Sequence, residues 1–210
     1  MKQHIEVQGT LQKVSCELEE LRRQDNISRC KNSMKDGMPF PTACRRVLGS
    51  IAGNSRCVDC GNHNPDWASV SYGILLCMRC SGRHRSYGVA TSRVRSISMD
   101  SWSHTQVLAM LEGGNEQLYN FYDRHDMGEK KSKVFNHRYQ TKAARFYRKN
   151  MEIHVAKVGQ IGLWKGRAAS RKGAILVRTT TTSNHLCPNN KNTTKPVFST
   201  AATSRQITIQ

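Results

Sequence analysis

Hydrophobic residues near the start of the chain recur at helical spacing. Leu11, Val14, Leu18 and Leu21 are separated by three, four and three positions, with charged residues around them. This spacing predicts a short amphipathic helix within residues 5–21. The stripe covers too few heptads to indicate a coiled coil, so we expect an accessory helix rather than a dimerisation zipper. Residues 32–41 contain one glycine and two prolines and are expected to form a linker.

The middle of the chain mixes helical spacing with short strand-like runs. Helical spacing predicts helices that begin near residues 42, 77, 103, 115 and 138, the last of which runs to residue 158. Ser103 and Gln106 form a capping box, and Thr42 and Asn115 are expected to cap the helices that follow them. Residues 67–76 are expected to form a small hairpin, and residues 93–99 are compatible with a strand.

Composition indicates one folded unit with flexible ends. The chain has 210 residues, of which 37% are hydrophobic, and this suits a domain of ordinary size. We expect an N-terminal helix and linker over residues 1–41, a folded domain over residues 42–160 and a disordered basic tail over residues 161–210. From Lys165 onward the sequence is rich in Ser, Thr and Asn, and it has eight lysines or arginines but neither aspartate nor glutamate.

Charge and hydropathy bear on the partners and the compartment. The formal net charge of +18 favours an anionic partner, which could be a nucleic acid, an acidic protein face or a membrane surface. The sequence contains no long apolar run and no secretory signal pattern, so we expect a cytoplasmic protein.

Four of the eight cysteines form two closely spaced pairs. Cys57 and Cys60 are separated by two residues, as are Cys77 and Cys80, and sixteen residues lie between the pairs. Two such knuckles can offer four thiolates to one tetrahedral ion, which predicts a Zn²⁺ site. A closed four-thiolate site leaves no coordination position for water. We therefore expect the zinc to be structural and the chemistry to reside in the basic segment after Cys80.

Together with their surroundings, these cysteines resemble those of the ArfGAP domain, a zinc-finger domain that activates Arf-family small GTPases. The resemblance covers about residues 44–158. Its elements stand in family order: Cys57-Val58-Asp59-Cys60-Gly61, Asn64-Pro65-Asp66-Trp67-Ala68-Ser69, Tyr72-Gly73, Cys77-Met78-Arg79-Cys80-Ser81-Gly82, His84-Arg85, Gly88, Val94-Arg95-Ser96, Asp100 with Trp102, Gly113-Gly114-Asn115 and Tyr139.

The resemblance implies a fold, a mechanism and a partner. The fold is α+β, a small zinc domain in which helices surround a short antiparallel sheet. The family's arginine finger corresponds to Arg85, and the implied partner is an Arf-family GTPase in its GTP form. The chain would then be no enzyme itself but a regulator in vesicle trafficking, recruited to Golgi or endosomal membranes. The basic tail would hold it near anionic lipid.

Physical chemistry supports an arginine in this role. Phosphoryl transfer to water spreads negative charge over the γ-phosphate and the leaving group, and a planar guanidinium stabilises that charge. A finger supplied in trans accelerates hydrolysis by on the order of 10³ to 10⁵. Arg83 and Arg85 would point roughly 200° apart on a helix, so they cannot share one task. His84 is expected to hydrogen-bond near the finger, and Trp67 to pack against the metal knuckles.

Two other functions fit part of the sequence. GATA-type zinc fingers also combine two Cys-x2-Cys knuckles with an internal tryptophan, and the net charge suits a nucleic-acid partner. The residues after Cys80 fit the activator pattern better. The second alternative is a catalytically inactive scaffold that binds the GTPase or a vesicle coat. Two departures from the family pattern keep it open, since Ala90 stands where a histidine is usual and Tyr87 where a leucine is usual.

Overall fold

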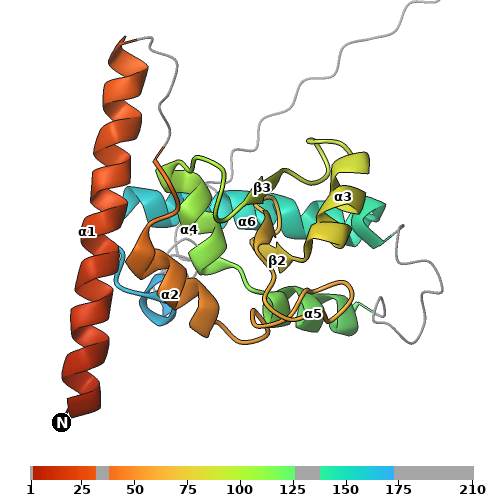
Figure 1. Cartoon of the computed structure of the whole chain (residues 1–210), viewed down its shortest axis with the longest axis horizontal. Coiled ribbons are helices and arrows are strands. Elements are labelled where there is room, and N and C mark those ends of the chain that lie inside the picture. The colour runs from red at the N-terminus through yellow and green to blue at the C-terminus, as the bar shows by residue number, and fades with distance from the viewer. Residues whose placement is uncertain (1, 32–37, 126–137, 173–210) are drawn as a thin grey trace, which may run out of the picture.

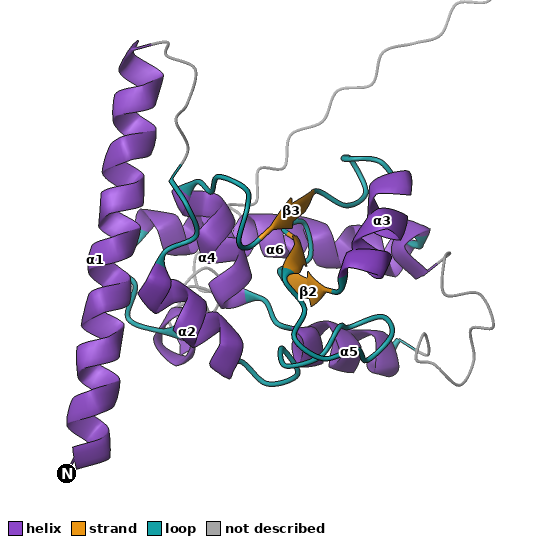
Figure 2. Ribbon diagram, viewed as in Figure 1, coloured by secondary structure: helices purple, strands orange, loops and turns teal. Residues whose placement is uncertain are grey.

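The computed structural model describes residues 2–31, 38–125 and 138–172, and within them helices dominate (Figures 1 and 2). A small antiparallel sheet lies among the helices, which confirms the α+β class expected from the sequence. The elements are α1 (Lys2–Lys31), α2 (Thr42–Ser50), β1 (Trp67–Ser69), β2 (Ile74–Leu76), α3 (Met78–Ser86), β3 (Val94–Ser96), α4 (His104–Glu112), α5 (Asn115–Arg124), the 3-10 helix η1 (Arg138–Gln140) and α6 (Lys142–Gln160).

The sheet has the order β2-β1-β3, and both pairings are antiparallel. Trp67 on the central strand pairs with Leu76 on one side and Ser96 on the other. The β1–β2 turn contains Gly73, whose φ of +64° favours glycine. A Cβ there would lie 2.5 Å from the carbonyl oxygen of Ala109, so the turn packs directly on α4. This contact fixes the direction in which β2 leads into α3.

Helix α1 is longer than the sequence pattern predicts and packs on the domain. It lies along one flank of the molecule, while α3 lies at the opposite end (Figure 1). Its predicted stripe is buried within the chain itself, since Val14, Leu18 and Leu21 are at most 2% exposed. This burial agrees with an accessory helix, and it supplies contacts to α2 and α4.

An acidic side chain of α1 caps helix α2. Glu17 accepts hydrogen bonds from the backbone N–H groups of Ala43 and Cys44, at 2.9 and 3.0 Å, in the first turn of α2. The predicted cap by Thr42 is wrong, because Pro41 occupies the N-cap position and makes no side-chain bond. A carboxylate from a distant helix satisfies these N–H groups instead.

The start of α5 also differs from the prediction. Gly114 rather than Asn115 occupies the N-cap position. The Asn115 side chain accepts from the N–H of Leu75 at 2.8 Å and donates to the carbonyl of Arg56 at 2.6 Å. It therefore joins α5 to β2 and to the loop that carries the first cysteine pair. The predicted capping box of Ser103 with Gln106 on α4 is confirmed.

Residues 161–172, which were expected from the sequence to belong to a disordered tail, are packed against the domain. Trp164 is 4% exposed, and its indole N–H donates to Oε1 of Glu112 at 2.6 Å. Ser170 donates to the same oxygen at 2.8 Å, and His154 contacts Oε2 at 2.8 Å. Burial raises the pKa of Glu112, but these hydrogen bonds outweigh burial and lower it. The folded unit therefore extends at least to residue 172, and residues 173–210 lie outside the described residues.

No helix in the described part of the chain is both long enough and apolar enough to cross a membrane. The remaining predicted helices and strands are present within a few residues of their expected limits. Tyr139 is an exception, because it lies in η1 rather than in the long helix, and Thr141 caps α6.

Candidate metal centre and the surface beside it

The structure brings the four predicted ligands together. The sulfur atoms of Cys57, Cys60, Cys77 and Cys80 all lie within 4.8 Å of one another, and those of Cys60 and Cys77 are 3.5 Å apart. A tetrahedral site with Zn–S bonds of about 2.3 Å requires sulfur separations of about 3.8 Å. The observed cluster fits that requirement. The four thiols can therefore hold one metal ion.

Backbone geometry explains why the two cysteine pairs meet. Cys77 follows β2 directly and occupies the N-cap position of α3, so its sulfur faces the first turn of that helix. The N–H of Cys80 points toward this sulfur at 3.5 Å. Gly61, at a φ of +74°, turns the first pair back, and the N–H of Val58 donates to the carbonyl of Leu75. The hairpin therefore aligns both knuckles.

Electrostatics favours a bound cation at the cluster. Burial raises the pKa of Cys57 to about 11 and raises that of Cys80 far above the ordinary thiol range. Burial also acts on Cys77, but hydrogen bonds from the neighbouring cysteines outweigh burial and lower its pKa. Four thiols cannot all ionise close together unless a cation compensates their charge. Thiolate sulfur is a soft donor of the kind that zinc accepts in structural sites.

A buried polar network lies directly beside the cluster and connects it to α3. His84 is completely buried, and its Nε2 lies 3.1 Å from Oδ2 of Asp59, which sits between the two cysteines of the first pair. The other ring nitrogen lies 2.7 Å from Oγ of Ser92. Oδ1 of Asp59 accepts from the hydroxyl of Tyr139 at 2.6 Å and from the guanidinium of Arg138.

The charge of Asp59 is well compensated by this network. Burial raises the pKa of its carboxyl, but the hydrogen bond from His84 and the charge of Arg138 outweigh burial, and the pKa falls to about 2. Since an ionised carboxylate can only accept, Nε2 of His84 is the donor. His84 is therefore an anchor for α3 and not a metal ligand, and the hydrogen bonding expected of it from the sequence is present. Asp59 and Arg138 were not predicted, because 79 residues separate them and no local pattern connects them.

Arg85 follows the buried His84 and is exposed on α3. Its Cζ lies 4.4 Å from the centroid of the Trp67 ring, which is a cation–π contact. Trp67 is half-buried, so it both packs beside the knuckles and supports the guanidinium. Arg83 is partly buried and, two positions away on the helix, points in another direction.

The surface around Arg85 is open. Met78 precedes Arg85 by seven positions, so the two side chains lie within about 20° of each other around the helix. Met78 is 76% exposed, and a Cβ at Gly82, which lies between them on the same face, would meet nothing within 4 Å. This face therefore combines an exposed cation, an exposed apolar side chain and bare backbone, a combination suited to close approach by another protein.

The fold and the site define a small α+β domain in which a four-cysteine cluster fixes a helix with an exposed arginine. The chain belongs to the ArfGap family, whose model is described as "Putative GTPase activating protein for Arf" and matches residues 43–156. This match confirms the family resemblance seen in the sequence.

Individual relatives agree with this assignment. The chain is 43% identical over 106 residues to mouse "ADP-ribosylation factor GTPase-activating protein 3", covering 50% of this chain and 20% of the relative. It is 41% identical over 96 residues to "ADP-ribosylation factor GTPase-activating protein GCS1" of Saccharomyces cerevisiae, covering 45% of this chain and 27% of the relative. The chain thus spans about a quarter or less of the length of these curated relatives.

A solved structure shares the fold. It is described as the crystal structure of a "putative GTPase activating protein for ADP ribosylation factor" from Cryptosporidium parvum. The TM-score is 0.51 at 26% sequence identity, and the match covers 59% of this chain and 99% of the other.

Proposed function

We propose that this chain activates GTP hydrolysis by an Arf-family small GTPase in its GTP form, with Arg85 inserted in trans as an arginine finger. Family membership supports the activity. The single observation that carries the residue assignment is the exposure of Arg85 next to the buried anchor His84. In this proposal the GTPase is the catalyst and the chain is its regulator.

A finger in trans must be charged, exposed and held in place before the partner arrives. Arginine stays protonated at all physiological pH values. The first turn of α3 carries two of the clustered cysteines, and the last turn carries His84, so both ends of the short helix are fixed. Stacking on Trp67 restricts the Arg85 side chain, and an exposed cation–π contact contributes only about 0.5–1 kcal/mol. The guanidinium can therefore leave Trp67 and enter a nucleotide pocket on docking.

We assign the metal of the four-cysteine cluster as Zn²⁺. When bound, the ion crosslinks the two knuckles and contributes folding free energy, without an open coordination position. The residues Cys57, Cys60, Cys77 and Cys80 would hold it. The chain's own part in the reaction remains the positioning and the charge of Arg85.

Single-turnover GTP hydrolysis by a purified Arf-family GTPase tests the proposal. Wild-type chain should accelerate hydrolysis, and Arg85→Ala should remove most of that acceleration, on the order of 10³ or more. Arg83→Ala removes the same charge two residues away and should change the rate little. Equal rates for wild-type and Arg85→Ala would reject the finger. Tight binding of the GTPase without any acceleration would instead identify an inactive scaffold.

The place of the protein in the cell is also a proposal. A cytoplasmic activator of an Arf-family GTPase would act in vesicle trafficking at Golgi or endosomal membranes. Residues 173–210 contain four lysines or arginines and no acidic residue, and each cation near an anionic surface contributes about 1 kcal/mol. A chain that ends at Lys172 should therefore sediment less with anionic vesicles than the full chain. Identical sedimentation would contradict a role of the tail.

A further inference from the structure

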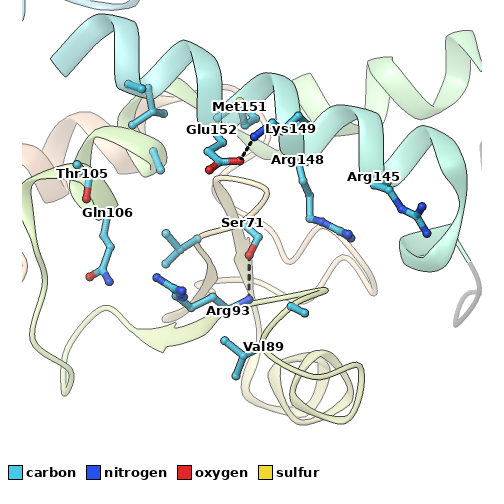
Figure 3. A pocket seen from close by; sticks show the side chains of 15 residues that line it. Ser71, Val89, Arg93, Thr105, Gln106, Arg145, Arg148, Lys149, Met151 and Glu152 are labelled. Carbon is cyan, nitrogen blue, oxygen red and sulfur yellow. Dashed lines mark hydrogen bonds and ion pairs between the residues drawn. The ribbon is translucent and has the colours of Figure 1, made fainter. Parts of the chain in front are cut away.

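A cavity of about 570 Å³ opens between α6, the start of α4 and the loop from α3 to β3 (Figure 3). Its volume lies within the range of about 300–1,000 Å³ that is typical of small-molecule sites. Neither Arg85 nor any of the four clustered cysteines lines it. The cavity is therefore separate from the site described above.

Basic side chains approach the cavity from two sides. Arg145, Arg148 and Lys149 come from α6, where spacings of three and four place them on one face. Arg93 lies on the opposite wall (Figure 3). Among the described residues that line the cavity, the acidic one is Glu152, and it pairs with Lys149 at 3.1 Å. Three arginines thus line the cavity, and none of them is paired with its acidic lining residue.

The arginines are placed so that donors remain for a ligand. Nη1 of Arg148 donates to the hydroxyl of Tyr72 at 2.7 Å and to the carbonyl of Tyr139 at 3.2 Å. This guanidinium is therefore held in position, and its Nε and Nη2 hydrogens remain. The guanidinium groups of Arg93 and Arg145 have no hydrogen bond or ion pair to any part of the chain that the structure describes. Both side chains are exposed.

The rest of the lining leaves room between these charges. Val70, Met151 and Val155 supply apolar surface, and the small side chain of Ala90 does not fill the opening. The hydroxyl of Ser71 accepts from the backbone N–H of Arg93 at 3.0 Å and keeps its own hydrogen for a ligand. The result is a concave site with apolar walls and several hydrogen-bond donors among its lining residues.

We propose that this cavity binds a compact anion that carries two or more phosphate groups. Guanidinium groups bind phosphate oxygens in a bidentate manner, and three arginines lining one cavity exceed what a single carboxylate needs. An inositol phosphate has this size and charge, either as a soluble molecule or as the headgroup of a lipid. Electrostatic attraction of an acidic protein requires only a basic surface and no cavity.

Calorimetric titration of the full chain with inositol trisphosphate and with inorganic phosphate tests the proposal. The test variant is Arg93→Gln with Arg145→Gln, which leaves the structural hydrogen bonds of Arg148 intact. The matched control is Arg46→Gln with Lys157→Gln, which removes the same charge from exposed positions outside the cavity. Inositol trisphosphate should bind wild type and control alike, and the test variant should bind about tenfold or more weakly. Inorganic phosphate should bind more weakly than inositol trisphosphate to all three.

Sedimentation with phosphatidylcholine vesicles, with and without phosphatidylinositol bisphosphate, distinguishes the two sources. Binding to the lipid headgroup predicts sedimentation that depends on this lipid and falls in the test variant more than in the control. Binding to the soluble anion alone predicts no difference between those variants. An equal loss of affinity for inositol trisphosphate in the test and control variants would overturn the proposal. The absence of inositol trisphosphate binding by wild type would also overturn it. An acidic protein surface would then be the better candidate for the occupant.

Discussion

Asp59 shows how one side chain connects the cysteine cluster to the proposed finger. It lies between Cys57 and Cys60, and its two oxygens bond His84 on α3 and the side chains of Arg138 and Tyr139 on η1. The carboxylate thus joins the first knuckle, the helix of Arg85 and a segment 79 residues away. A buried ion pair of this kind adds little net stability, but it is costly to break, because it leaves an uncompensated charge.

Asp59→Asn should therefore destabilise the protein strongly, by about 3–5 kcal/mol, because Arg138 would keep a buried charge without its counter-ion. The matched control is Asp66→Asn, which breaks the ion pair with Arg45 at 3.0 Å between side chains that are 38% and 56% exposed. That pair should contribute less than about 1 kcal/mol. Urea denaturation of the metal-loaded variants measures both values. Similar decreases in the free energy of unfolding for the two variants would contradict the role given to Asp59.

Helix α3 is the element on which the proposed docking face depends. Gly82 lies in this helix with open space where a side chain would stand, so packing within the chain does not require a glycine there. Glycine in a helix costs about 0.8–1 kcal/mol relative to alanine. Gly82 thus lowers the stability of the helix and is not required for packing within the chain. Its presence is consistent with a surface that a partner approaches closely.

Substitutions at Gly82 separate stability from docking. Gly82→Ala should raise the free energy of unfolding by about 1 kcal/mol and leave GTPase activation largely intact. Gly82→Leu should fold equally well, because its side chain would extend into solvent, but it should reduce activation by obstructing the face between Met78 and Arg85. Thermal unfolding and single-turnover hydrolysis provide the two readouts. Full activity in Gly82→Leu would contradict this docking face.

Elements were predictable where their determinants are local. The capping box joins Ser103 to Gln106 three positions later, and the spacing of the two Cys-x2-Cys pairs alone indicates a candidate metal site. The cap of α2 was not predictable, because Glu17 acts on Ala43 across 26 positions. Neither local polarity nor periodicity indicates such a bond, because the packing of α1 on the domain determines which N–H groups Glu17 reaches.

The end of the domain was misplaced for the same reason. The composition after residue 160 is that of a disordered segment, but one tryptophan in it is buried beside an acid 52 positions earlier. A single buried aromatic contributes much to packing and changes average composition little. Arg85 was proposed as the finger from the family pattern, whereas its contact with the Trp67 ring came from the geometry alone.

At the scale of the whole molecule, peripheral segments pack against one side of the part that matches the family. Helix α1 caps α2 and α4 through Glu17 and Asp25, and residues 161–172 bury Glu112 at the end of α4. These contacts surround α4, whereas the four-cysteine cluster fixes α3 at the other end of the molecule (Figure 1). The core is thus supported by packing on one side and adjoins the four-cysteine cluster on the other.

Metal removal should therefore affect α3 most. Purified chain should contain one zinc ion per molecule, and chelation should lower the melting temperature and abolish GTPase activation, because structural zinc contributes on the order of 10 kcal/mol to small domains. Cys77→Ser should reproduce the effect, whereas Cys30→Ser, at an exposed position of α1, should not. Metal analysis measures the zinc content, and thermal unfolding measures the melting temperature of each variant. A metal-free protein with unchanged melting would contradict a structural ion.

We propose above that the guanidinium of Arg85 stabilises the transition state of hydrolysis on a partner protein. Capture of the chain by an immobilised Arf-family GTPase loaded with GDP and aluminium fluoride, which mimics the transferring phosphoryl group, tests it most directly. We predict that wild-type chain and Arg83→Ala are captured only when aluminium fluoride is present, and that Arg85→Ala is not captured. Capture of Arg85→Ala to the same extent as wild type would show that Arg85 does not stabilise the transferring phosphoryl group.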